Sequence, residues 1–330
     1  MNRREFIALT TGAATAPIAW PLSAGAQQRK TPARIGILSG FSSGSLNDTR
    51  MKPFLQELQV LGWVEGRNIV IDHRQVSDPG QLGVTAQELV ATKPDLILAT
   101  PTPAMQAIWR ATRSIPVVFG NVSDPVEGGF VASMARPDGN VTGFTSFEYS
   151  LGGKWLEILK EYAPETKRAL VLIVPENYIS RGLLRSIEAA GPALGIEVTA
   201  APVQNASEIE QAIAGFAREG GGGLLTPPHP IITNNTKLIV ELARTHCLPA
   251  VYPFRYFALD GGIVAYGTVE SDVYQRAAGY VDRILKGAKP GELPVQNPVK
   301  FELVVNLETA RATNLTIPSS FLIRADEVIE

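Results

Sequence analysis

A sequence pattern that occurs twice, about 130 residues apart, constrains the fold of this chain most. Three short segments return in the same order in the second half of the chain, two of them after 133 residues and one after 126. The pairs are Leu61-Gly62 and Leu194-Gly195, Leu98–Pro103 and Leu224–Pro230, and Ile115–Phe119 and Leu248–Tyr252. Solenoid repeats are much shorter, so repetition at this period indicates a duplicated domain.

Within each half, short apolar or β-branched runs alternate with runs whose apolar residues recur at helical spacing. The strand-like runs are 35–38, 69–71, 96–99 and 117–119, then 170–174, 197–200, 223–225 and 250–252. This alternation predicts βαβ units, and hence parallel sheets covered by helices on both faces. A chain of 330 residues also exceeds the size at which a single core stops growing. We therefore predict an α/β protein with two doubly wound parallel-sheet lobes joined by a hinge.

The last third of the chain is expected to complete both sheets by crossing between the lobes. A strand-like run at 263–266 precedes a helix that ends at Lys286-Gly287, and an alternating strand at 301–305 precedes a short helix from Leu307. Our predicted division assigns residues 33–148 and about 266–300 to the first lobe, and residues 149–265 and about 301–330 to the second.

Residues 1–26 have the composition of an export signal rather than of a folded element. Arg3 and Arg4 precede an apolar stretch from Ala8 to Leu22, and Ala24-Gly25-Ala26 supplies the small residues of a cleavage site. The paired arginines resemble a twin-arginine signal, although the general secretory route stays open. We expect a cleaved signal peptide and a soluble periplasmic protein.

Charge and cysteine content exclude several classes of partner. The formal net charge is -2, with 30 basic and 32 acidic residues. This balance does not predict binding of nucleic acid, which favours an excess of basic residues. A neutral or zwitterionic small molecule fits better. The single cysteine, Cys247, rules out an intrachain disulfide and is expected to be buried and inert. No cysteine near the cleavage site offers a lipid attachment point, so we expect a freely diffusing protein. We also expect it to be a monomer.

The predicted topology also locates a binding site. Ligands of open parallel sheets bind beyond the carboxyl ends of the strands, and two such sheets facing each other form a cleft lined by matching loops. The loops are 39–45, 100–103 and 120–124 in the first lobe, and 175–180, 226–230 and 253–256 in the second.

Several phrases resemble the ABC transporter substrate-binding protein family typified by tryptophan-binding, TrpX-like proteins, which have the type I periplasmic binding protein fold. They are Leu61–Asn68, Lys93–Asp95, Ile115–Phe119, Asp124–Val126, Gly139–Gly143, Lys154–Glu157, Ile284–Gly287 and Arg324–Ile329. The resemblance covers essentially the whole chain after the export signal. It implies capture of an organic solute, a membrane permease and a cytoplasmic ATPase as partners, and no catalysis. It does not specify the ligand.

Twelve residues of the predicted cleft are candidates for ligand contact. They are Phe41, Ser42, Ser43, Thr100, Thr102, Asp124, Glu176, Tyr178, Thr226, Tyr252, Phe254 and Arg255. Hydroxyls before a helix, as at Ser42, Ser43 and Thr102, either bind a carboxylate or simply cap the helix. The aromatic residues either line the cleft or belong to a core.

The charged candidates have equally plain alternatives. Asp124 either binds a ligand amino group or opens an Asp-Pro turn, and Glu176 competes with it for the first role. Arg255 either pairs with a ligand carboxylate through its guanidinium fork or with a surface acid.

Two other functions stay open at this level. One is a periplasmic sensor that passes its liganded state to a receptor. The other is a serine hydrolase, because Gly40–Gly44 matches Gly-x-Ser-x-Gly with Ser42 as nucleophile. That elbow belongs to a later strand of a hydrolase sheet, and His73, His229 and His246 form no triad pattern with it, so each histidine is read as structural. No motif predicts a metal or a cofactor.

Overall fold

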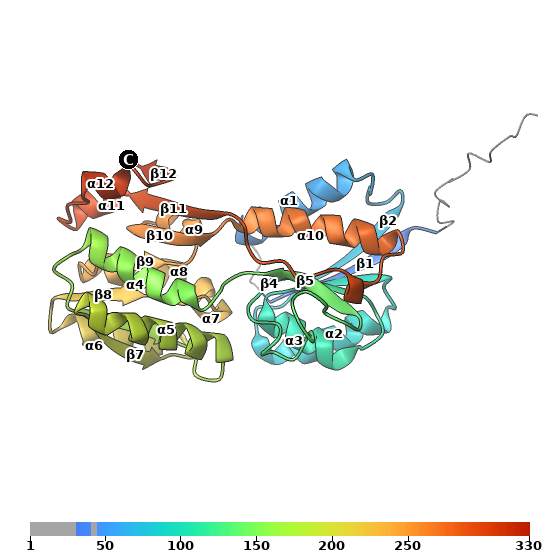
Figure 1. The fold of residues 1–330 in the computed structure, drawn as a ribbon, viewed down its shortest axis with the longest axis horizontal. Coiled ribbons are helices and arrows are strands. Elements are labelled where there is room, and N and C mark those ends of the chain that lie inside the picture. The colour runs from blue at the N-terminus through green and yellow to red at the C-terminus, as the bar shows by residue number, and fades with distance from the viewer. Residues whose placement is uncertain (1–30, 41–44) are drawn as a thin grey trace, which may run out of the picture. The chain divides into compact units, whose positions relative to one another are not determined.

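The computed structural model describes residues 31–40 and 45–330, and within them the strands form two sheets (Figure 1). The predicted export signal, and Phe41, Ser42 and Ser43, therefore lie outside the described residues. The first sheet has the order β2-β1-β3-β4-β5 and is parallel throughout. Its strands are β1 (Ala33–Ser39), β2 (Ile69–Gln75), β3 (Leu96–Thr100), β4 (Val117–Val122) and β5 (Val141–Thr145).

The second sheet repeats this order and extends it. It runs β7-β6-β8-β9-β10-β11-β12, so its first five members match β2-β1-β3-β4-β5 one for one. Its strands are β6 (Arg168–Ile173), β7 (Glu197–Pro202), β8 (Gly222–Leu225), β9 (Ala250–Tyr252), β10 (Val264–Thr268), β11 (Phe301–Asn306) and β12 (Glu327–Ile329). Pairing is parallel except between β10 and β11. The predicted α/β fold with two parallel-dominated sheets is thus confirmed.

Helices cover both faces of the first sheet because its strands are apolar on both sides. Along β3, Leu96 and Leu98 face one core, which includes Phe54 and Val273, whereas Ile97 and Ala99 face the other. The first face carries α1 (Ser45–Val60) and α10 (Glu270–Leu285), and the second carries α2 (Leu82–Ala91) and α3 (Thr102–Ala111). This is the near-continuous apolar pattern expected of a parallel strand buried on both sides.

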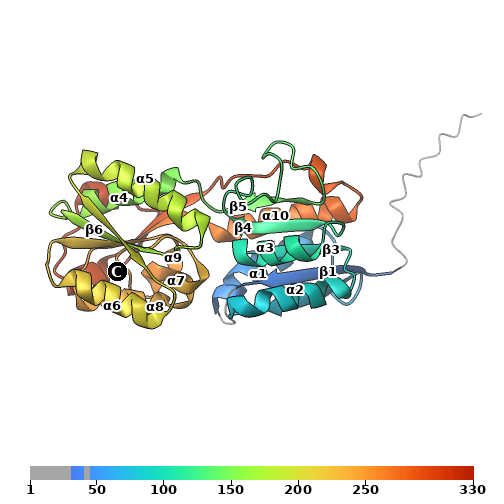
Figure 2. The same ribbon diagram turned by 90° about the horizontal axis from the view of Figure 1, so that it is seen from below.

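The second sheet is covered in the same way (Figure 2). One face carries α4 (Ser150–Tyr162) and α5 (Tyr178–Leu194), and the other carries α6 (Ala206–Ala217) and α8 (Thr236–Thr245). The shorter helices are α7 (Pro230–Asn234), α9 (Arg255–Leu259), α11 (Leu307–Ala312) and α12 (Ser319–Leu322). Trp155 of α4 anchors this helix to the sheet by donating from Nε1 to the carbonyl of Tyr266, over 2.7 Å.

The two lobes exchange one helix each. After β5 of the first sheet the chain continues into α4, which packs on α5 and the second sheet. After β10 of the second sheet it continues into α10, which packs on α1 and the first sheet. The chain returns to the second sheet at β11. We call the first sheet with α1, α2, α3 and α10 the first lobe, and the second sheet with its helices the second lobe. The numbered boundaries that the sequence suggested stay a prediction.

The repeated segments occupy equivalent places. Gly62 and Gly195 each follow a long helix, α1 and α5, with φ of 92° and 64°. A left-handed glycine is a common way to end a helix, which explains why Leu-Gly occurs at both points. The repeat at 115–119 and 248–252 ends in β4 and β9, the fourth strands of the two series.

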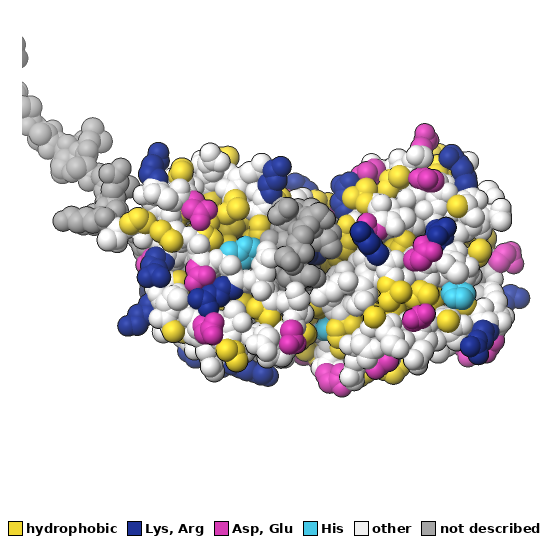
Figure 3. Space-filling view, turned by 180° about the vertical axis from the view of Figure 1, so that it is seen from behind, with side chains coloured by type: hydrophobic (Ala, Val, Ile, Leu, Met, Phe, Trp, Pro, Cys, Tyr) yellow, Lys and Arg dark blue, Asp and Glu magenta, His cyan; other side chains and the backbone are white. Residues whose placement is uncertain are grey.

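One expectation from the sequence is wrong. Cys247 is exposed, not buried, because it occupies the turn between α8 and β9 with φ of 51°, outside the apolar face of the helix. Among the described residues, no helix is long and apolar enough to cross a membrane. On the face that Figure 3 shows, charged side chains of both signs are scattered over both lobes, without a patch of one sign.

Candidate functional site

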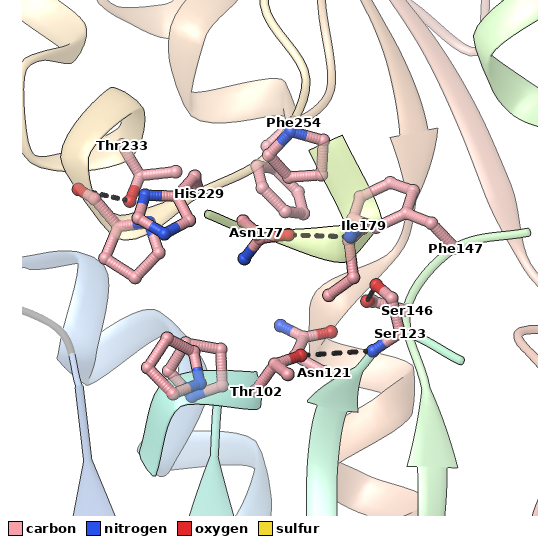
Figure 4. A pocket seen from close by; sticks show the side chains of 14 residues that line it. Thr102, Asn121, Ser123, Ser146, Phe147, Asn177, Ile179, His229, Thr233 and Phe254 are labelled. Carbon is pink, nitrogen blue, oxygen red and sulfur yellow. Dashed lines mark hydrogen bonds between the residues drawn. The ribbon is translucent and has the colours of Figure 1, made fainter. Parts of the chain in front are cut away.

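A cavity lies where the carboxyl ends of the strands of both sheets meet (Figure 4). It contains about 410 Å³ of empty space, part of which is open to solvent. The first turns of α3, α5 and α7 border it. The described residues that line it are Pro101, Thr102, Pro103, Asn121, Ser123, Ser146, Phe147, Asn177, Ile179, Pro228, His229, Pro230, Thr233 and Phe254.

Short polar side chains form the wall from the first sheet. Thr102 Oγ1 accepts a hydrogen bond from the backbone N–H of Ser123 over 3.3 Å, and the hydroxyls of Ser123 and Ser146 lie 2.9 Å apart. These bonds tie the start of α3 to the segments after β4 and β5. The wall is therefore built from three neighbouring segments of one sheet edge.

Asn121 reaches the cavity because β4 is irregular at this point. The register between β4 and β5 shifts between Phe119 and Val122, and Asn121 has φ of 55°. Asparagine tolerates this left-handed conformation better than most residues. Its Nδ2 donates to Glu270 Oε1 over 2.6 Å, whereas its Oδ1 has no hydrogen-bond partner among the described residues.

A buried ion pair lies behind Asn121. Arg50 and Glu270 are only 1% and 8% exposed, and Arg50 Nε lies 3.0 Å from Glu270 Oε1. Burial lowers the pKa of Arg50, but the Glu270 carboxylate together with Tyr256 and Tyr274 more than offsets this and raises that pKa above its ordinary value. Arg50 also lies 3.4 Å from the hydroxyl of Tyr256, which belongs to the second lobe. Both charges are thus fixed beside the cavity.

In the second lobe, Asn177 is the N-cap of α5. Its Oδ1 accepts from the backbone N–H groups of Ile179 and Ser180, over 2.8 and 3.1 Å. This is the usual way in which asparagine satisfies the free N–H groups at the start of a helix. Its Nδ2 has no hydrogen-bond partner among the described residues and lies at the cavity (Figure 4).

His229 plays the same capping part at α7. Its Nδ1 accepts from the backbone N–H of Ile231 over 3.2 Å. Burial lowers the pKa of His229 from its ordinary value of about 6.5 to about 4, so the ring is neutral near pH 7. Since Nδ1 accepts, the proton of the neutral ring is on Nε2.

Aromatic rings form the apolar part of the cavity wall. Phe147 and Phe254 pack edge to face with their centroids 5.4 Å apart, and Phe254 stacks on Tyr256 at 5.3 Å. Phe147 follows β5 and Phe254 follows β9, so each sheet contributes one ring. Such a wall suits an aromatic or aliphatic group.

Unpaired polar atoms concentrate at the cleft ends of the strands. Of the described residues, those with a buried side-chain oxygen that lacks a partner include Ser39 at the end of β1, Asn121 in β4, Thr226 just after β8, and Thr268 at the end of β10. Buried polar groups in native proteins almost always have partners. Their gathering at these strand ends indicates a place where a polar solute or water binds.

The structure brings some predicted residues to the cavity and places others nearby. Thr102 and Phe254 line it. Glu176 and Tyr178 line an adjoining pocket that shares Thr102 and His229 with it, and Tyr178 donates to the carbonyl of Ser123 over 3.0 Å, across the lobes.

The other predicted residues have partners within the protein. Asp124 Oδ1 accepts from the N–H of Glu127 over 2.9 Å, as a turn opener does, and Asp124 lines a separate pocket. Arg255 pairs with Glu302 and Glu327.

Three predicted residues are fully buried beside the strands. Thr100 Oγ1 lies 2.6 Å from the hydroxyl of Tyr274, and the ring of Tyr252 stacks on Phe257 in the core of the second lobe. Thr226 is the third, and its hydroxyl oxygen is one of the unpaired atoms named above.

The sequence did not single out the most informative cavity residues, although its predicted loops contain them. Asn121, Asn177 and His229 lie in the predicted loops 120–124, 175–180 and 226–230. The signal that could have identified these residues is their position just after a predicted strand. The described residues contain no cluster of His, Cys, Asp and Glu that could hold a metal ion.

Two open α/β sheets that meet around a cavity of rings and uncharged polar groups define a solute-binding protein. Residues 34–329 match the family of ABC transporter substrate binding proteins, and the chain belongs to that family. The predicted family is therefore confirmed, as is the prediction of a binding protein rather than an enzyme.

Known proteins agree with this assignment. A tyrosine-binding protein of Clostridioides difficile is 28% identical over 287 residues, which are 87% of this chain and 82% of the relative. A conserved domain protein of Vibrio cholerae is 25% identical and superposes with a TM-score of 0.85, covering 90% of this chain and all of that one. An ABC domain of Streptococcus pneumoniae in complex with L-Trp is 24% identical with a TM-score of 0.84, covering 91% of this chain and all of that one.

Proposed function

We propose that this protein is the periplasmic binding component of an ABC importer and that it captures an amino acid with an aromatic or large apolar side chain. The proposal rests on the residues that line the cavity. Among its described residues, His229 alone is titratable and is neutral near pH 7, and the rest are uncharged polar or apolar. A zwitterion with no net charge and an apolar side chain suits such a site, whereas an ion would leave a charge uncompensated.

The relatives support this class of ligand. The related Clostridioides difficile protein is a tyrosine-binding protein, and the similar Streptococcus pneumoniae structure contains L-Trp. The paired rings of Phe147 and Phe254 offer the matching apolar surface.

The way in which the lobes are connected supports hinge closure. The chain crosses between them after β5, after β10 and before β11, so a rotation is confined to three short segments. Contacts such as that from Tyr178 to Ser123 form only when the lobes approach each other. The ligand shifts the equilibrium toward the closed form because it contacts both lobes there.

Isothermal titration calorimetry with L-tryptophan, L-tyrosine and L-phenylalanine tests the ligand class. We expect saturable binding of at least one of them, and a thermal shift that grows with its concentration. D-glucose and L-glutamate are the controls and should give neither signal. Binding of a control with none of the three would overturn the proposed class.

Export is tested separately, because residues 1–26 lie outside the described structure. We expect mass spectrometry of the periplasmic fraction to find a mature chain that begins at Gln27. An uncleaved chain confined to the cytoplasm would overturn the proposed location. Loss of solute uptake on deletion of the partner permease would link the protein to transport, whereas unchanged uptake would favour a sensor.

A further inference from the structure

We infer that the cavity is polarised between its lobes, with hydrogen-bond donors on the second lobe and an acceptor on the first, so that an amino acid binds in one orientation only. Its carboxylate faces Asn177 and His229, and its ammonium faces Asn121. The inference rests on the proposed amino-acid ligand and goes beyond it by assigning each end of the ligand to a lobe.

The reasoning uses a property that amide and imidazole side chains share. Each has a donor end and an acceptor end, and a fixed partner at one end determines what the other end presents. Asn121, Asn177 and His229 each make such an internal bond at one end and line the cavity. Their polarity toward a ligand is therefore set by the protein.

Asn177 presents a donor. Its internal partners are the backbone N–H groups of Ile179 and Ser180, which can only donate, so they must bond to Oδ1. The amide nitrogen is then the end that is left for a ligand. Rotating the amide would place an NH₂ group against two N–H groups at the start of α5 and would remove the cap.

His229 also presents a donor. The N–H of Ile231 can only donate, which requires an unprotonated Nδ1 and places the proton on Nε2. Figure 4 shows His229 and Asn177 together on the side of the cavity opposite Thr102 and Asn121. Two N–H donors from the second lobe can thus converge on one carboxylate.

Asn121 presents an acceptor. Its internal partner is Glu270, a carboxylate held by Arg50, and a carboxylate can only accept. Asn121 must therefore direct Nδ2 to Glu270, which leaves Oδ1 without a partner. The buried Arg50–Glu270 pair acquires a function in this arrangement, because it positions the amide of Asn121 without itself lining the cavity.

The chemistry of an amino acid matches this division. Its carboxylate only accepts and its ammonium only donates, so reversal would place two donors against the ammonium and an acceptor against the carboxylate. Reversal leaves all three protein groups unpaired, which a buried site does not tolerate.

Two analogues of L-tryptophan separate the two ends in the test. Tryptamine lacks the carboxylate, and indole-3-propanoate lacks the ammonium. Their affinities are measured by competition against L-tryptophan in calorimetry, for the wild-type protein and two variants. Melting temperatures of the unliganded variants show whether they fold.

Asn177→Asp is the variant for the donor side. It keeps an oxygen that caps α5, because aspartate caps as well as asparagine, but replaces the NH₂ group by a second acceptor. We expect L-tryptophan and indole-3-propanoate to bind at least about tenfold more weakly, since a charged hydrogen bond is lost and a like charge is added. Tryptamine should bind as before or better.

Asn121→Gly is the matched variant for the acceptor side. Glycine accepts the φ of 55° at this position, so the amide is removed without backbone strain. We expect L-tryptophan and tryptamine to bind about tenfold more weakly, with little change for indole-3-propanoate.

The crossed pattern is the supporting result. If each variant affected the opposite analogue, or both analogues equally, the assigned orientation would be overturned while the ligand class stood. If the wild-type protein bound none of the aromatic amino acids, the proposed function would fall, and this inference with it.

Discussion

The two lobes share one strand order but present different chemistry to the cavity. Asn121 of the first lobe and Phe254 of the second are 133 residues apart, the spacing of the repeat, and both line the cavity. One is an amide with an unpaired acceptor, and the other is an aromatic ring. Equivalent places in the two lobes therefore contribute different side chains to the cavity.

Another equivalent pair differs in its partners rather than in its residue type. Thr100 and Thr226 are each the threonine of a Leu-x-Thr-Pro segment at the carboxyl end of the third strand of their series. Both side chains are fully buried. Thr100 bonds to Tyr274 of α10, the helix that the first lobe receives from the chain after β10, whereas the Thr226 hydroxyl has no partner among the described residues. The exchanged helix α10 thus gives the first-lobe threonine a hydrogen-bond partner that the second-lobe threonine lacks among the described residues.

The largest effect is expected from Arg50, which has a buried acidic partner in the first lobe. Arg50→Met leaves Glu270 buried without its charge partner and should lower the free energy of unfolding by about 3–5 kcal/mol. The control is Arg244→Met in the second lobe, which breaks an exposed pair with Glu241 and should change stability little. Chemical denaturation measures both, and equal effects would contradict the distinction.

Replacing the two threonines by valine should have different effects on the free energy of unfolding. Thr100→Val removes the bond to the buried Tyr274 hydroxyl and should destabilise the unliganded protein by about 1–3 kcal/mol. Thr226→Val removes an unpaired buried hydroxyl and should be neutral or stabilising by up to about 1 kcal/mol. A destabilising Thr226→Val would show that this hydroxyl has a partner in the unliganded protein.

The last prediction concerns the titration of His229, whose effect on stability is spread over several pH units. Its pKa is lower in the folded chain than in the unfolded chain, so between about pH 6.5 and pH 4 the unfolded chain binds more protons. The free energy of unfolding should fall as the pH falls through this window, by at most about 1.4 kcal/mol per pH unit. His229→Gln should reduce this slope, as measured by denaturation at pH 7, 6 and 5.

His73 of the first lobe provides the comparison for this titration. Burial also lowers its pKa, although the charge of Asp72 opposes the shift. His73→Gln should therefore reduce the same slope, and its effect on ligand affinity should be negligible because His73 does not line the cavity. An unchanged slope in both variants would assign the pH dependence to other groups.

Much of the fold could be predicted because its signals are local and repeated. Strands such as 96–99 are apolar on both faces, and the same segments recur in the second half. β5 was missed because Gly143 interrupts it. That glycine packs so closely on β4 that an added Cβ would lie 2.2 Å from the carbonyl oxygen of Phe119. Such a close approach is a property of the assembled sheet and leaves no pattern in the sequence.

The site could be predicted only as a set of loops. Which end of Asn121 meets a ligand depends on Glu270, 149 residues away, and Glu270 depends in turn on Arg50. Asn177 and His229 each cap a helix, and the capping bond fixes which atom of each side chain is left for a ligand. Partners this distant in the sequence cannot be recognised from spacing.

The exchange of α4 and α10 has a consequence for how the chain can be divided. A gene fragment that ends after β5 would encode all five strands of the first sheet but not α10, and so would leave the apolar residues of α1, such as Phe54 and Leu58, uncovered. A fragment that begins at β6 would lack α4 and the ring of Trp155 in the core of the second lobe. Although the sequence contains two copies of one pattern, neither copy encodes a complete lobe, and each lobe depends on a helix that the other half of the chain supplies.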